Sequence, residues 1–462
     1  MRKLVVWMIV AVLLVSNVGA FADDDSRFAG MELNILSIKW DFMESMLSIY
    51  AQEIADEMGI TLNVSYYTYD ESRQKVVADT IASVDTWDLI YVDTKQIPEY
   101  AAVGALEPIV PLLEEYPIEG YDFADFSEKA LSEASFNDVQ YAIPIMSDCV
   151  GLVYRTDILN DEGEKAAFLE KYGYELGVPT TYAQYLDICT FFTRKAGDTL
   201  MGETLTEDFY GTCHSDKATD FLWHDYITYM YAFGADIYDE QTMMPTWNSP
   251  ENVAAGEYYQ ALAATEPSGH INMTSGESMS VFANGNCAMI IEFYSRTLYL
   301  GGEGSLIEGK FAFDLCPTQD ESRKNAAILS TNFLGVFSGS KKQEMTTVFL
   351  QKLTSKETAT KLALHTADDE GLYKVGDPLF PRASVMNDPQ VLNMFPALTL
   401  VLDTLNNPDI AAFNHIRLPE YPEIIEIGGT ALSRILEGEN VSSAFDKAQK
   451  QMEELFQDAG YI

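Results

Sequence analysis

The chain has 462 residues, 47% of them hydrophobic, and its 71 acidic residues against 29 basic ones give a net charge of −42 at pH 7. A field of this sign repels nucleic acid, phosphate esters and anionic membranes, whereas neutral and cationic ligands are tolerated. The charge therefore excludes a nucleic-acid-binding function, and the length and hydrophobic content are sufficient for two cores.

The N-terminus has the features of an export signal. Arg2 and Lys3 precede an apolar run over residues 4–15, and Ala20-Phe21-Ala22 forms a small-x-small cleavage site. We expect a cleavable signal peptide over residues 1–22, and its removal from 462 residues leaves 440. The apolar run is too short to span a bilayer, no later run is longer, and no cysteine follows it to carry a lipid. These features predict export to the periplasm without an integral membrane segment, and we expect a monomer.

The sequence contains no motif of a metal centre, a cofactor site or a common enzyme class. The histidines at positions 214, 224, 270, 365 and 415 show no metal-ligand spacing, and H-E-x-x-H and G-x-S-x-G patterns are absent. We therefore expect a protein that is not an enzyme and that uses no cofactor or metal. The odd number of cysteines leaves at least one thiol unpaired, and we expect most thiols to be buried. The sequence leaves the pairing open among Cys149, Cys189, Cys213, Cys287 and Cys316.

A β-α-β unit opens the chain after the leader. Residues 31–38 alternate as a strand, and a helix with Asp41 and Glu44 in capping-box spacing follows and ends at Gly59. Residues 60–67 and 87–92 give two further strands, so a parallel sheet flanked by helices is expected.

Two loops of this unit are candidates for ligand contact. In open α/β sheets the ligand crevice lies beyond the carboxyl ends of the strands. Trp40-Asp41 follows the first strand and Asp93-Thr94 follows the third. The alternative is that Asp41 and Asp93 serve as helix N-caps, and both roles stay open.

Residues 141–155 form two apolar runs that meet at Ser147-Asp148. No turn glycine or Asn-Gly pair stands between the runs, as a hairpin would require. We interpret them as one extended segment that leaves one packed unit and enters another, with Asp148 exposed at the crossing. A buried strand pair interrupted by a bulge is the alternative. Similar breaks at 330–332 and 380–382 predict further crossings.

Helices dominate the remainder of the chain. Pro179-Thr180-Thr181 opens one helix, and a second over residues 219–234 carries Trp223 and His224. Two more are expected over residues 250–262 and 443–459.

Short motifs follow one another along nearly the whole chain beyond the signal peptide. Besides residues 141–155, they are Asp88–Asp93, Ala101–Glu107, Ala232–Ile237, Asn248–Glu251, Phe282–Met289, Ser338–Lys341 and Gly438 before the last helix. Each is a handful of small and apolar residues. Their shared order resembles that of the family 1 extracellular solute-binding proteins, the sugar receptors of ABC importers, which include maltose-binding proteins.

The resemblance implies an α/β, two-lobed periplasmic binding protein fold of class II type. Each lobe would be a mixed, mainly parallel sheet flanked by helices, and crossing hinge segments would join the lobes. Residues 27–146 with 328–384 would form the N-terminal lobe, and residues 147–327 with 385–462 the C-terminal lobe. The family's cleft-lining positions fall on Trp40, Asp41, Asp93, Thr94, Asp148, Trp223, His224, Glu292, Tyr294 and Asn332. The family often has tryptophan where Tyr294 stands, and Cys149 beside Asp148 is unusual.

These residue types suit a carbohydrate. Carboxylates and amides bind hydroxyl groups, and flat rings cover the apolar faces of a sugar. We expect a receptor that captures a neutral sugar, oligosaccharide or polyol by lobe closure and delivers it to an ABC permease. Two alternatives stay open: a cationic amine ligand, which would suit the carboxylates and rings, and a secreted glycoside-acting enzyme, because carboxylates are abundant.

Overall fold

The computed structural model describes residues 25–217, 220–300, 305–319, 327–365, 379–407, 410, 412–413 and 415–462. The expected signal peptide, residues 1–22, lies outside the described residues. Within the described ranges, none of the helices combines the length and the apolar character that a bilayer crossing requires.

The main sheet has eight strands, and two short hairpins lie apart from it. The order in the sheet is β10-β6-β11-β3-β1-β2, with β9 paired to β6 and β12 paired to β11. The strands are β1 Glu32–Ile38, β2 Thr61–Tyr67, β3 Leu89–Asp93, β6 Ile143–Arg155, β9 Met289–Phe293, β10 Phe311–Asp314, β11 Ala327–Val336 and β12 Ala412–Phe413, and the hairpins are β4 Ser135–Phe136 with β5 Val139–Gln140 and β7 Thr199–Leu200 with β8 Glu203–Thr204.

Helices cover the sheet. They are α1 Asp41–Ser45, α2 Ala51–Met58, α3 Tyr69–Ile81, α4 Gln96–Val103, α5 Ile109–Glu115, α6 Glu128–Glu133, α7 Thr156–Leu159, α8 Glu162–Tyr172, α9 Tyr182–Phe192, α10 Asp220–Ala232, α11 Pro250–Ala263, α12 Ser275–Ala283, α13 Gln343–Leu353, α14 Lys356–Ala363, α15 Ala383–Met386, α16 Pro389–Met394, α17 Leu398–Asn406, α18 Tyr421–Leu436 and α19 Val441–Asp458. Short 3₁₀ turns include η4 His270–Asn272 and η5 Tyr294–Tyr299, and the π-helix η2 Met46–Tyr50 joins α1 to α2.

The opening β-α-β unit is confirmed. Strand β1 pairs in parallel with β2 and with β3, as strands joined by crossover helices do. The first helical segment ends at Gly59, whose φ of 68° places it in the left-handed region that glycine tolerates best. The expected capping box is wrong, however, because the helix begins at Asp41 and its N-cap, Trp40, makes no side-chain cap bond.

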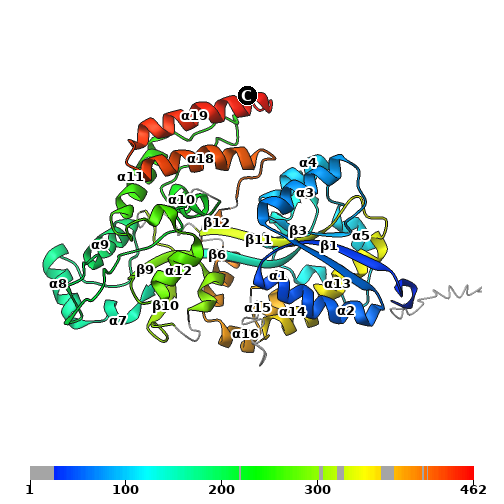
Figure 1. Cartoon of the computed structure of the whole chain (residues 1–462), viewed down its shortest axis with the longest axis horizontal. Coiled ribbons are helices and arrows are strands. Elements are labelled where there is room, and N and C mark those ends of the chain that lie inside the picture. Colours follow the sequence, from blue (N-terminus) through cyan, green and yellow to red (C-terminus); the bar gives the residue numbers. More distant parts are fainter. Residues whose placement is uncertain are drawn as a thin grey trace, which may run out of the picture.

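The expected single extended segment is also confirmed, because residues 143–155 form the single unbroken strand β6. The break at 330–332 likewise lies inside one strand, β11, which pairs antiparallel with β6 through a bulge after Asn332. Figure 1 shows β6 and β11 running side by side from the part of the molecule that holds β1 and β3 to the part that holds β9.

The expectation of mainly parallel sheets is wrong for the region around β6. Strand β6 pairs antiparallel with β9, β10 and β11, and β11 pairs antiparallel with β3. The sheet is therefore mixed and continuous, and parallel order is confined to β1–β3 and the short β11–β12 pair.

Two large hydrophobic clusters flank the middle of β6. The first cluster takes its residues from 28–149 and 327–405, together with Tyr294. The second cluster takes its residues from 150–316 and 416–456, together with Ile328. Side chains of residues 385–405 also pack in the first cluster, so this segment does not belong to the second cluster, as the expected C-terminal lobe of 385–462 would require.

All five cysteines are buried as free thiols. The expected burial is confirmed, and the structure contains no disulfide between them. Burial raises the pKa of each thiol, so none is activated as a nucleophile.

Candidate functional site

Strand β3 ends in a short polar segment that reaches α10. The Asp93 carboxylate accepts the backbone N–H of Lys95 at 2.9 Å and lies 3.8 Å from the Lys95 ammonium. The Lys95 Nζ atom is 3.0 Å from Nε2 of His224. Asp93 and His224, predicted separately from the sequence, are therefore joined through a lysine that no sequence pattern had marked.

Thr94 opens a second buried network. Its hydroxyl donates to Glu133 at 3.3 Å, Glu133 accepts a further bond from Thr331, and Thr331 lies 2.7 Å from the Ser147 hydroxyl. Arg417, just before α18, donates to the carbonyl oxygens of Thr94 and Glu133 at 3.1 and 2.9 Å. This network ties the end of β3 to both crossing strands.

Asp148 lies in the middle of β6, next to Ser147. Its two carboxylate oxygens accept the backbone N–H groups of Cys149 at 2.7 Å and Ser295 at 3.0 Å. The expectation that Asp148 is exposed is wrong: the residue is 3% exposed, because these two N–H groups replace water around the carboxylate. Burial raises its pKa to about 6.

Glu292 and Asn332 complete the polar group. Glu292, on β9, accepts a bond from the Arg296 guanidinium at 2.7 Å. Asn332 pairs with Asp93 across β11 and β3, and its side-chain oxygen accepts a bond from the Tyr91 hydroxyl.

These side chains form one polar layer between the two hydrophobic clusters. We define the polar layer as Asp93, Thr94, Lys95, Glu133, Ser147, Asp148, His224, Glu292, Ser295, Arg296, Thr331, Asn332 and Arg417. The members come from β3, α6, β6, α10, β9, η5, β11 and the segment before α18. Elements that pack in the first and in the second hydrophobic cluster therefore meet here.

The electrostatics of the layer follow from burial. Burial lowers the pKa of His224 well below its usual range, and Lys95 and Arg296 lower it further. Burial likewise raises the pKa of Glu133 to about 7, although bonds from Thr331 and Thr94 oppose this shift. His224 is thus a neutral ring facing an ammonium group at pH 7.

Four predicted site residues lie outside the polar layer. Trp40 is half-buried and packs edge-on against Phe42 with ring centroids 5.1 Å apart, and Asp41 is exposed on the first turn of α1. Both residues remain candidates for ligand contact at the edge of the polar layer.

Trp223 and Tyr294 are core residues in this structure, contrary to the prediction that they are ligand platforms. Trp223 is fully buried and stacks on Trp247 with centroids 5.4 Å apart and planes 5° apart. Tyr294 is fully buried, its hydroxyl donates to the Asp314 carbonyl at 2.6 Å, and its ring lies directly over Gly151.

Sequence reasoning missed Lys95, Glu133, Arg296 and Arg417. Lys95 is adjacent to the predicted Asp93-Thr94 pair, and Arg296 follows Glu292 at helical spacing, so these two carried a local signal. Glu133 and Arg417 had none, because their partners lie far away in the chain.

Two surface hollows lie elsewhere and contain none of the candidate residues. One, of about 550 Å³, is lined by residues of α14 and by Leu364 just after it, and the other, of about 630 Å³, lies between residues 27–31 and 338–345.

The fold is similar to that of many solved structures, among them solute-binding proteins of ABC transporters. An ABC transporter solute-binding protein from Agrobacterium radiobacter K84 in complex with ribitol matches with a TM-score of 0.76 at 23% identity, over 93% of this chain and 100% of that one. One from Agrobacterium vitis S4 with D-mannitol matches with a TM-score of 0.74 at 22% identity, over 93% and 99%. Maltose-bound MalE3 of T. maritima matches with a TM-score of 0.71 at 19% identity, over 92% and 100%. The chain thus has the α/β periplasmic binding protein fold.

No match is found among curated proteins. The sequence model of a protein family nevertheless matches residues 50–368, and that family is described as bacterial extracellular solute-binding proteins. This match covers more than half of the chain. Its members bind solutes and catalyse no reaction, so the expectation of a non-enzyme is confirmed, and the chain belongs to the bacterial extracellular solute-binding protein family.

Proposed function

We propose that the chain is the receptor of an ABC importer, which captures a neutral carbohydrate in the periplasm and delivers it to a membrane permease. The ligand is a sugar, an oligosaccharide or a polyol, and it binds at the polar layer. The receptor works as an exported monomer without a cofactor.

Two lobes of class II type, joined by β6 and β11, would perform the capture. Supporting this division, each hydrophobic cluster contains its own helices, and among the described strands β6 and β11 contribute side chains to both clusters. We keep residues 27–146 and 147–327 as the cores of the two lobes. Because residues 385–405 pack in the first cluster, we assign them to the N-terminal lobe and place the last boundary near residue 405.

The observation that carries the proposal is the charge balance of the polar layer. Glu292 is paired with Arg296 at 2.7 Å, Asp93 lies beside Lys95, and Asp148 accepts two backbone N–H groups. A cationic ligand would need carboxylates whose charge the protein leaves uncompensated. A neutral ligand needs only oriented donors and acceptors, which a compensated layer provides.

The polar layer contains side chains from elements of both hydrophobic clusters, which supports capture of the solute by closure of two lobes around it. Lys95 follows β3 and touches His224 of α10, and Arg417 reaches the carbonyl of Thr94. A solute that contacts groups on both sides favours the closed state by its difference in affinity for the two states. Micromolar binding would correspond to about −8 kcal/mol.

The structural relatives give independent support for the ligand class. Their bound molecules are ribitol, D-mannitol and maltose, all of them neutral and rich in hydroxyl groups. We extend this chemistry to the present chain as a proposal.

A thermal-shift screen of residues 23–462 tests the function. The panel contains ribitol, mannitol, maltose and longer maltodextrins, with putrescine and spermidine as the cationic arm. A ligand at about 100 times its Kd should add about 2.7 kcal/mol to the free energy of unfolding. We expect a saturable rise with one sugar or polyol group and no product after long incubation. A rise with amines alone would replace the carbohydrate by a cation, and cleavage of a glycoside would overturn the receptor role.

A further inference from the structure

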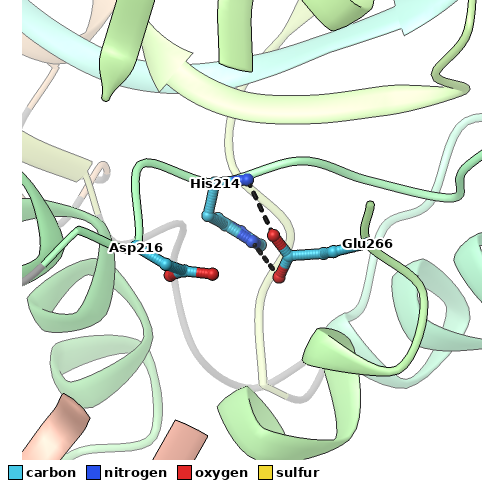
Figure 2. A group of neighbouring side chains, drawn as sticks. All are labelled: His214, Asp216 and Glu266. Carbon is cyan, nitrogen blue, oxygen red and sulfur yellow. Dashed lines mark hydrogen bonds and ion pairs between the residues drawn. The ribbon is translucent and has the colours of Figure 1, made fainter. Parts of the chain in front are cut away.

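Apart from the polar layer, four titratable side chains converge in the second hydrophobic cluster. His214 and Asp216 lie in the loop before α10, and Glu266 and His270 follow α11. The Nδ1 atom of His214 is 2.8 Å from Glu266, and the Nδ1 atom of His270 bonds Asp216 and lies 3.8 Å from Glu266. Figure 2 shows the Asp216 carboxylate pointing toward the His214 ring and the Glu266 carboxylate.

The atoms that could bind a cation are close enough to share one. One ligand atom each from His214, Asp216 and Glu266 lies within 4.8 Å of the others. Metal–nitrogen and metal–oxygen bonds of about 2.0–2.2 Å set neighbouring ligand atoms of a tetrahedral zinc site roughly 3.4 Å apart. The Nδ1 atom of His214 lies 2.8 Å from Oε1 of Glu266, and the Nδ1 atom of His270 lies 3.8 Å from Oε2 of the same carboxylate, on either side of that value.

Two tyrosines hold these side chains in place. The Tyr229 hydroxyl lies 2.6 Å from Nε2 of His214, which leaves Nδ1 turned toward the carboxylates. The Tyr259 hydroxyl donates to the far oxygen of Asp216 at 2.5 Å. Outer partners that orient a histidine and a carboxylate in this way are typical of metal sites.

Because the cluster is buried, its negative charge must be compensated by nearby positive charge. The side chains of Glu266 and Asp216 are 1% and 0% exposed, so two carboxylates lie in an apolar interior. Such a pair requires two compensating positive charges, from two imidazolium rings or from one divalent cation. His270, at 13% exposure, leaves a route from solvent.

We propose that His214, Asp216 and Glu266 bind one Zn²⁺ ion, with the neighbouring His270, whose Nδ1 atom bonds Asp216, as the fourth candidate ligand. Two imidazole nitrogens and two carboxylate oxygens suit zinc, whereas Ca²⁺ and Mg²⁺ prefer sets made of oxygen alone. Sequence spacing did not reveal the site, because His214 and Glu266 stand 52 residues apart and each half contributes only two ligands. The inference is independent of the proposed sugar-binding function.

The ion would act as a structural clamp. It would join the loop over residues 211–217 to the segment after α11, which already meet where the Gly211 N–H donates to the Thr265 carbonyl and the His214 N–H donates to Glu266. Structural zinc contributes directly to the stability of the fold that holds it.

The test is zinc binding to the full mature chain after chelation and dialysis. We expect about one zinc ion per chain after desalting, with sub-micromolar affinity and a higher melting temperature. Asp216→Asn combined with His270→Gln should weaken zinc binding by about 100-fold or more. The matched control is His365→Gln, because His365 is half-buried and bonds Tyr50 outside the cluster, and it should bind zinc like the wild type.

Two results would overturn the site: a wild-type chain that retains no zinc, or full zinc binding in the folded double variant. If circular dichroism shows that the double variant does not fold, zinc X-ray absorption of the wild type decides. Four nitrogen or oxygen neighbours with imidazole scattering support the site. Sulfur ligation, for which Cys213 is adjacent to His214, would contradict it.

Discussion

Lys95 and His224 are 129 residues apart in the sequence, yet Nζ of the lysine lies 3.0 Å from Nε2 of the histidine. The contact joins the end of β3 to α10, and therefore the two hydrophobic clusters. A buried ammonium at this distance keeps the imidazole neutral. The pair therefore connects the two sides of the polar layer, and the pKa of His224 depends on the charge of Lys95.

Replacing Lys95 by Met should raise the pKa of His224. The pKa should nevertheless stay below its ordinary value, because burial is the larger cause of the shift and Lys95 the second. NMR titration of the imidazole signals measures the change, with Lys195→Met on the exposed surface as the control. An unchanged or lower pKa in Lys95→Met would contradict the assigned contact.

His224 also predicts how stability depends on pH. The folded ring stays neutral, whereas the unfolded ring binds a proton near pH 6.5. The unfolded state therefore binds more protons below that pH, and the contribution of His224 to the free energy of unfolding is lost as the pH falls below about 6.5. Urea unfolding of His224→Gln between pH 5 and 8 should show a weaker loss on acidification than the wild type; an equal loss would contradict this.

Glu133 should give the free energy of unfolding the opposite pH dependence to that of His224. Its folded pKa is raised from 4.5 to about 7, so the folded state binds more protons than the unfolded state between those values. Its contribution is present below pH 4.5 and is lost as the pH rises through 7, on the order of 3 kcal/mol in total. Glu133→Gln should remove this slope, because a neutral amide occupies the site at every pH.

Urea titrations across this range check the Glu133 prediction. Glu128→Gln, on the exposed side of the same helix α6, is the control and should keep the wild-type slope. A Glu133→Gln profile that matches the wild type would show that the buried carboxyl does not titrate there.

Trp223→Ala should act on stability rather than on ligand affinity. The ring is fully buried against Trp247, and a Cβ atom placed on Gly428 would lie 2.3 Å from it, so the ring fills tightly packed space. Truncation of such a residue costs about 3–5 kcal/mol. Chemical denaturation measures the loss, and Trp40→Ala, half-buried at the surface, should lose less. A stable Trp223→Ala variant with a weakened Kd would restore the prediction of a ligand platform.

Features of the molecule that depend on a few neighbouring residues could be predicted from the sequence, and features that depend on distant residues could not. The β1-α-β2 unit and the unbroken β6 were predictable, because alternation, apolar run length and the absence of turn residues act within a few positions. Asp93 and Asp148 were marked as site residues for the same reason, since they stand at a strand end and at a polar break between apolar runs, whereas His224 was implied by the family resemblance. The burial of Asp148 was not predictable, because the N–H that compensates it belongs to Ser295. Trp223 was misassigned because Trp247 and Gly428 bury it from other helices.

Gly151→Ala should destabilise the protein by steric overlap on β6. A Cβ atom there would lie 1.9 Å from the Tyr294 hydroxyl oxygen and 2.0 Å from the adjacent ring carbon. Overpacking of this kind costs about 1–3 kcal/mol. In a Tyr294→Ala background the cost of Gly151→Ala should largely disappear, which a double-mutant cycle measures.

The control for this cycle is Gly177→Ala, where an added Cβ atom meets no other atom within 4 Å. It should change stability little in either background. Equal costs of Gly151→Ala with and without the tyrosine ring would contradict the close approach.

Hydrogen–deuterium exchange, with and without the sugar or polyol selected by the thermal-shift screen, tests whether the solute binds at the polar layer. Amide exchange reports local opening, so a captured solute slows it where it binds. Binding at the polar layer predicts added protection at residues 93–96, 147–149, 292–296 and 330–332, on both sides of the layer. Protection confined to residues 356–364, which are α14 and the residue after it, or to the hollow between residues 27–31 and 338–345, would place the solute elsewhere and contradict the proposed receptor site.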